Sequence, residues 1–204
     1  MATSTKSLAA TIATARKARA AATTIATAAL VTASALATAP VHAMGSGNPY
    51  EDFQVGVSYT IYQPSFTNGL KESQVQSFDC GSGANMEDSL VGHYAQNKKQ
   101  SQWYQGRWFA LLQGDPICAD GAYGANMGTR TINGVKWTIY SGCLNDGGAV
   151  CSQAQSRNYK QYGGTLSATM PKVGNAPATN VIIGFGGMNL QPALKIAAGL
   201  TPAN

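Results

Sequence analysis

Residues 130–139 read RTINGVKWTI, and the Asn-Gly pair at the centre of this stretch is the strongest local folding signal in the chain. Asn and Gly accept the positive φ angles of a two-residue type I′ turn, and the residues on both sides are rich in types that favour strands. The stretch therefore predicts a β-hairpin. Its register is expected to place Ile132 opposite Val135 and Arg130 opposite Trp137.

Other strands are expected on both sides of this hairpin. Alternating or short apolar runs of the kind that is typical of strands occur at 53–61, 75–78, 107–113, 164–170 and 181–185. The last of these contains VIIGF, which is apolar enough for a buried central or closing strand, because a strand covered on both faces loses its alternation.

Two short helices complete the predicted fold. Residues 86–96 place Leu90 and Tyr94 at helical spacing, behind an Asn that is suited to cap the first turn. A second helix is expected from about residue 190. Its inner face is expected to comprise Leu190, Leu194, Ala197 and Ala198. Because the helices do not alternate with the strands, the expected fold class is α+β, a mainly antiparallel sheet of about six strands with two short helices, stapled by disulfides.

The first 43 residues have the composition of an export signal. They contain no acidic residue, and a weakly apolar Ala/Thr-rich run follows four basic residues. The segment ends in Val41-His42-Ala43, with small residues at the two positions that a signal peptidase reads. The expected organisation is a cleaved export signal at 1–43, a flexible lead-in at 44–52 and a single globular domain at 53–204.

Cleavage would deliver a secreted or cell-envelope protein with no transmembrane anchor. An uncleaved anchor and an organelle transit peptide, including a two-part signal for a thylakoid-type lumen, are the alternatives. Four of the 14 basic residues and none of the nine acidic ones lie in the segment, so the remainder is nearly neutral. Nucleic-acid binding needs a basic patch on the folded domain, and we therefore expect no nucleic-acid partner.

All four cysteines follow this segment, and an even number in an exported chain predicts two disulfides. Three pairings are possible. The short separation of Cys143 and Cys151 around the turn-like NDGG favours a local bridge, which leaves Cys80 with Cys118. A zinc site is disfavoured, because the chain has no Cys-x-x-Cys and His93 is the single histidine after the segment. We expect no metal and no other cofactor.

The sequence shows no catalytic constellation. A nucleophilic triad needs a histidine, and His93 is expected on the exposed side of the helix at 86–96. Ser82 does not lie in a Gly-x-Ser-x-Gly motif. No spacing singles out an acid and a nucleophile for glycoside cleavage among the carboxylates Glu51, Asp52, Glu87, Asp88, Asp115 and Asp120.

Aromatic residues offer the one candidate binding face. Trp103 and Tyr104 lie among Gln and Ser residues and are expected to face a ligand, whereas Trp108 and Phe109 fit a buried strand. The ligand class is open between a small molecule, a glycan, a lipid and a peptide.

The sequence therefore predicts an exported, non-catalytic binding or envelope-associated domain. Such a domain requires an apolar or aromatic groove without converging ionisable groups. The first alternative, an unrecognised extracytoplasmic hydrolase, requires two carboxylates, or His93 with a partner, in one cleft. The second alternative, a structural or assembly subunit, requires a large exposed apolar patch.

Overall fold

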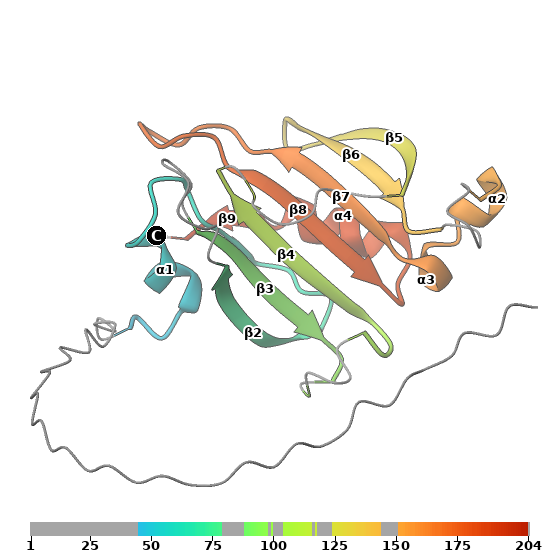
Figure 1. Cartoon of the computed structure of the whole chain (residues 1–204), viewed down its shortest axis with the longest axis horizontal. Helices are drawn as coiled ribbons and strands as arrows, with labels where there is room; N and C mark the ends of the chain where they lie inside the picture. The colour runs from blue at the N-terminus through green and yellow to red at the C-terminus, as the bar shows by residue number, and fades with distance from the viewer. Residues whose placement is uncertain are drawn as a thin grey trace, which may run out of the picture. The chain divides into compact units, whose positions relative to one another are not determined.

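A seven-stranded antiparallel sheet forms the centre of the fold in the computed structural model (Figure 1). The structure describes residues 45–78, 88–97, 99, 104–115, 117, 124–143 and 151–203. The strands of the sheet are β2 (Lys71–Phe78), β3 (Ser89–Ala95), β4 (Trp108–Gly114), β5 (Ala125–Ile132), β6 (Val135–Ser141), β7 (Gly164–Thr169) and β8 (Asn180–Gly186). Together with the helices described below, this sheet confirms the α+β class.

The order of strands across the sheet is β2-β3-β4-β8-β7-β6-β5. It consists of two meanders, one running from β2 to β4 and the other from β5 to β8. The chain reaches the far edge of the sheet after β4 and then returns strand by strand, so that β8 lies beside β4 in the middle. The prediction of a central strand at 181–185 is thus confirmed.

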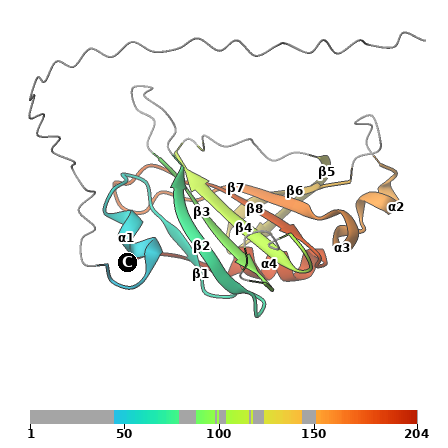
Figure 2. The same ribbon diagram turned by 60° about the horizontal axis from the view of Figure 1, so that its bottom comes forward.

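One face of the sheet carries the hydrophobic core. Figure 2 shows α4 (Leu190–Ala198) lying against this face, where it contacts β5, β7 and β8. The buried side chains that the sheet contributes include Tyr94, Phe109, Leu111, Trp137, Ile139, Leu166, Val181, Ile183 and Phe185. A second, two-stranded sheet pairs β1 (Tyr62–Pro64) with β9 (Leu200–Pro202), and β9 follows α4 directly.

The hairpin at 130–139 is confirmed in its turn and in its register. Asn133 and Gly134 have φ angles of 49° and 79°, as a type I′ turn requires. Ile132 pairs with Val135, and Arg130 pairs with Trp137. The turn has a second role that the sequence did not reveal, because the side chain of Asn133 donates to the carbonyl of Ala198 at the end of α4.

The helix predicted from about residue 190 is confirmed, but its inner face is different. Ala193, Ile196 and Ala197 are buried against the sheet, whereas Leu190 and Leu194 are only partly buried and Ala198 is exposed. The small alanine side chains allow the helix backbone to approach the sheet closely, so the narrow stripe at positions i, i+3 and i+4 faces inward instead of the leucines.

The strand predicted at 53–61 does not form, and a short helix lies where the flexible lead-in at 44–52 was expected to meet it. Residues Pro49–Gln54 form the helix α1, which begins after Asn48. The Asn48 side chain accepts a hydrogen bond from the backbone N–H of Tyr50, and the proline at the first helical position lacks only an N–H that would have no helical partner. Tyr50 is buried, which ties α1 to the core.

Most of the hydrogen-bond partners of the backbone at residues 59–62 are side chains, not the backbone of a neighbouring strand. The amide of Gln54 donates to the carbonyl of Tyr59 and accepts from the N–H of Ile61. The amide of Gln113 on β4 donates to the carbonyl of Tyr62 at 2.8 Å and accepts from its N–H at 2.7 Å. The alternation at 53–61 is therefore real in part, because Tyr59 and Ile61 are buried, but no ladder forms there.

The helix predicted at 86–96 is also wrong, because Ser89–Ala95 forms β3. Residues four apart share a face in a helix and in a strand, so the pair Leu90 and Tyr94 fits both structures. Pairing of this segment with β2 and β4 decides for the strand, and Gly92 lies between the two residues. Because Gly92 has no side chain, the hydroxyl of Tyr50 is able to pack against its backbone. A Cβ at this position would lie 1.9 Å from that oxygen.

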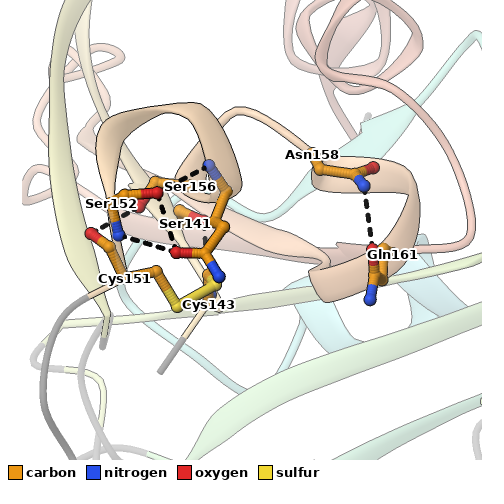
Figure 3. The surroundings of a disulfide bond; sticks show 8 residues. Ser141, Cys143, Cys151, Ser152, Ser156, Asn158 and Gln161 are labelled. Atoms are coloured by element: carbon orange, nitrogen blue, oxygen red, sulfur yellow. Dashed lines mark hydrogen bonds between the residues drawn. A yellow bond between two sulfur atoms is a disulfide. The ribbon is translucent and has the colours of Figure 1, made fainter. Parts of the chain in front are cut away.

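A disulfide joins Cys143 and Cys151, with their Cα atoms 5.8 Å apart, as the short separation predicted (Figure 3). The other predicted pair, Cys80 and Cys118, lies outside the described residues. The bridge leads directly into α2 (Gln153–Ser156), whose first turn is closed by a capping box between Ser152 and Gln155. A further short helix, α3 (Tyr159–Tyr162), precedes β7.

The buried Gln113 provides a test of how the two-stranded sheet is held. Gln113→Leu removes the two hydrogen bonds that the Gln113 amide makes with the N–H and the carbonyl of Tyr62. Because Gln113 is fully buried, the change is expected to lower the free energy of unfolding by about 2–4 kcal/mol. Urea unfolding followed by circular dichroism measures the change.

The matched control is Gln191→Leu, which places the same substitution on the exposed side of α4 and is expected to change stability by less than about 0.5 kcal/mol. Equal losses in the two variants would show that the Gln113 amide does not hold Tyr62. Gln113→Glu should regain stability as the pH falls, because only the protonated carboxyl is able to donate to the Tyr62 carbonyl.

Candidate functional site

A groove of about 960 Å³ lies on the face of the sheet opposite the core. The alternation of the strands explains how it arises. On β4, Phe109 and Leu111 are in the core, while Trp108, Ala110 and Leu112 line the groove. The other strands that contribute to the groove alternate in the same way and bring Val91, His93, Thr165, Ile182, Gly184 and Gly186 to it.

The floor of the groove is hollow because small residues lie side by side in the middle of the sheet. A row of paired residues runs from His93 on β3 through Ala110 on β4 and Gly184 on β8 to Thr165 on β7. Ala110 and Gly184 contribute a methyl group and a hydrogen, so the row has side chains of ordinary length only at its two ends. Ala110 is buried and Gly184 is partly buried, and their small size leaves space beside the backbone for a bound molecule.

One wall of the groove is aromatic. Trp108 pairs with Gly186, and its indole lies over this glycine, because a Cβ on Gly186 would lie 2.5 Å from Nε1. The ring of Tyr104 stands nearly perpendicular to the indole, with the ring centroids 4.8 Å apart. Tyr104 lines the groove and is 63% exposed, so it provides an aromatic surface at the rim of the groove that is open to solvent.

The groove carries few ionisable groups. His93 is half-buried, and this burial lowers the pKa of its imidazole below the usual 6.5, so the ring is neutral at pH 7. Lys160 on α3 contributes a cation at the rim, beside Gln161 and Tyr162. Among the described residues that line the groove there is no carboxylate.

The carboxylates named in the sequence do not meet in this groove. Asp52 accepts a hydrogen bond from the N–H of Ser46, and Glu51 accepts one from the side chain of Asn48, so both serve the start of α1. Asp88 lines a separate, smaller cavity. Glu87, Asp120 and Ser82 lie outside the described residues. In the described part of the chain, no cluster of three or more His, Cys, Asp or Glu residues is placed to hold a metal ion.

Of the two aromatic residues predicted to face a ligand, Tyr104 lies on the groove, and Trp103 lies outside the described residues. Trp108 was expected in a buried strand, but it is half-buried and forms the wall. The missed signal is the spacing of Gly184 and Gly186, which removes side chains from one face of β8. Gly184 lies in the strand predicted at 181–185, whereas Gly186 resembles a turn residue in the sequence but is the last residue of β8.

Comparisons of the chain with protein-family models, with curated proteins and with solved structures found no match. No described helix has the length and apolar character needed to cross a membrane. The Cys143–Cys151 bridge is compatible with export to an oxidising compartment. Function is therefore argued from the chemistry of the groove.

The two glycines of β8 give a matched test of the groove wall. Gly186→Ala forces the indole of Trp108 to move and is expected to cost about 1–2 kcal/mol of stability. Gly184→Ala places a Cβ at an ordinary distance of 3.8 Å from the indole, so it should be neutral or slightly stabilising. The indole N–H resonance of Trp108 and the urea midpoint report both effects. A shifted resonance in Gly184→Ala, or an unshifted one in Gly186→Ala, would contradict the placement of the ring.

Proposed function

We propose that this chain is an exported, non-catalytic binding protein whose groove holds a small, uncharged and largely apolar molecule with a flat ring. The observation that carries the proposal is the hollow floor formed by Ala110 and Gly184 next to the indole of Trp108. Ligand sites are typically concave and mostly apolar, with a few polar groups that fix orientation, and their volumes are of the order of several hundred cubic ångströms.

The composition of the walls supports an uncharged ligand. A neutral His93 and the hydroxyl of Thr165 stand at opposite ends of the row across the floor, and the hydroxyl is able to exchange hydrogen bonds with a polar edge of the ligand. Lys160 is the one permanently charged side chain in the described lining, and it lies at the rim. A buried ligand charge would therefore lack a compensating group at the floor.

The flat floor and the indole support a ring-shaped ligand. A strand stripped of side chains at Gly184 offers a planar surface, and Trp108 offers an aromatic edge or face with which rings associate at distances of about 4.5–7 Å. A long acyl chain, a glycan or an extended peptide would also contact aromatic residues. These ligands are outcomes that the binding test below separates from the proposed one.

The hydrolase alternative has less support. Hydrolysis by a nucleophile or by a carboxylate pair needs acidic and basic groups that converge on one point. The described lining contains the imidazole of His93 but no carboxylate with it. The structural-subunit alternative needs a continuous apolar surface. The large exposed apolar residues in the described part of the chain come from separate segments, and they are Val55, Phe66, Phe78, Tyr104 and Val173.

Filling the groove should abolish binding without unfolding the protein. The neutral fluorescent probe N-phenyl-1-naphthylamine is expected to bind saturably with one-to-one stoichiometry. Gly184→Val adds an isopropyl group to the floor and is expected to weaken binding about tenfold or more, and Trp108→Ala should do the same. The control Phe66→Ala removes a partly exposed aromatic ring elsewhere and should leave the affinity unchanged.

Unaltered probe affinity in Gly184→Val would refute the groove as the binding site. Mass spectrometry of a solvent extract of the natively purified protein then identifies the natural occupant, and a glycan, acyl chain or peptide there would replace the proposed ligand class. Hydrolysis of ester or glycoside substrates that is lost in His93→Ala would favour the enzyme instead.

Export is a separate part of the proposal and has its own test. The intact mass of the protein isolated from its own cells should correspond to a chain that begins at Met44. It should rise on reduction by the hydrogens of two disulfides, one of which joins Cys143 and Cys151. A full-length mass with free thiols at Cys80 and Cys118 would contradict both cleavage and the second bridge.

A further inference from the structure

A second cavity of about 700 Å³ lies on the face of the sheet that α4 covers. Its walls come from the β5–β6 hairpin, from α2 and from the beginning of α4. Ile139 shows which face is involved, since it belongs to the core side of β6, whereas the neighbouring Tyr140 pairs with Thr165 of the groove row. The two cavities are therefore separated by the sheet.

Two arginines from distant parts of the chain line this cavity. Arg130 lies on β5, in the register position opposite the buried Trp137, and Arg157 forms the end of α2. Both are exposed, so their guanidinium groups are hydrated and free of a desolvation cost. Among the described residues that line the cavity there is no Asp or Glu. The charged side chains in the described part of the lining are thus both positive.

The position of Arg157 is fixed by covalent and hydrogen-bonded restraints. Cys151 is bridged to Cys143 at the end of β6, and the capping box holds the following turn. The backbone N–H of Arg157 then donates to the carbonyl of Gln153 at 3.2 Å. The positive charge of Arg157 acts on the neighbouring Tyr159. Burial raises the pKa of the Tyr159 phenol, and the charge of Arg157 partly opposes that rise. Arg157 therefore lies next to Tyr159 at the edge of the cavity.

The rest of the wall combines apolar side chains with the uncharged polar residues Asn126, Thr129, Gln153 and Ser156. Met127 and Leu190 are partly buried against the core, and Ile139 is 3% exposed. Ala125 and Cys151, which are both buried, also line the cavity. The cavity thus offers hydrocarbon surface together with two guanidinium groups, whose planar N–H pairs match the two oxygens of a carboxylate. An anion with an apolar body uses both kinds of surface.

We propose that this cavity binds a small amphipathic acid, with the carboxylate held by Arg130 and Arg157 and a short hydrocarbon chain against Met127, Ile139 and Leu190. The site is distinct from the groove, and neither needs the other to be occupied. The ionic contact supplies orientation and discrimination against uncharged molecules, while burial of the chain supplies most of the affinity.

The test compares octanoate with octanol, two probes of equal chain length that differ in charge. Titration calorimetry of the oxidised protein is expected to show saturable binding of octanoate at one site and at least tenfold weaker binding of octanol. Arg130→Gln and Arg157→Gln should each weaken octanoate about tenfold, because each removes a charge-assisted hydrogen-bond donor. Neither side chain is buried, so both variants should fold.

The matched control is Lys136→Gln, which removes one positive charge from the same hairpin but from the exposed side of β6, away from Trp137 and Ile139. It should change the affinity for octanoate less than twofold. Equal affinities for octanoate and octanol, or equal losses in Lys136→Gln and the arginine variants, would overturn the proposal. Octanoate that shifts the amide resonances of β3 and β8 in the groove, and not those of Arg130 and Arg157, would overturn it as well.

Discussion

The pairing of β4 with β8 is the interaction on which the rest of the structure depends. Within the seven-stranded sheet, this ladder from Trp108↔Gly186 to Gly114↔Asn180 is the one place where the two meanders meet. The two strands are distant in sequence, so their association closes a long loop and must be driven by burial of apolar side chains. Phe109 and Leu111 stand beside Phe185 and Ile183 on the core face and supply that burial.

The same ladder creates the groove on its other face. Gly184 and Gly186 weaken β8 as a strand, since glycine loses more conformational freedom on folding than any other residue and has no side chain to pack. The indole of Trp108 covers Gly186, and this contact accounts for one of the two glycines. Among the described residues, the indole of Trp108 approaches Gly184 less closely, since a Cβ at Gly184 would lie 3.8 Å from the ring. Gly184 therefore leaves room for a side chain at the centre of the sheet, and this room is available to a bound molecule.

The sequence predicted those elements whose signals are local. The hairpin at 130–139 and the bridge between Cys143 and Cys151 depend on residues within one turn or one loop, and both were correct. The segment around Leu90 and Tyr94 failed because four-residue spacing fits two secondary structures and only long-range pairing decides between them. The groove could not be predicted, because the row from His93 to Thr165 forms only after strands from both meanders have come together.

The segment between β6 and β7 links both cavities to the redox state of the protein. Tyr159 lines the cavity that contains Arg130 and Arg157. The next three residues of the same short helix line the groove, and they are Lys160, Gln161 and Tyr162. Helices of four residues are not stable on their own, so α2 and α3 need external anchors. Contact of Tyr159 with Phe185 provides one anchor, and the disulfide that precedes α2 provides the other (Figure 3). In a reducing compartment the covalent anchor would be lost and walls of both cavities would loosen together, whereas an oxidising compartment preserves them. The bond that supports the geometry of both sites is therefore compatible with the proposed export of the chain.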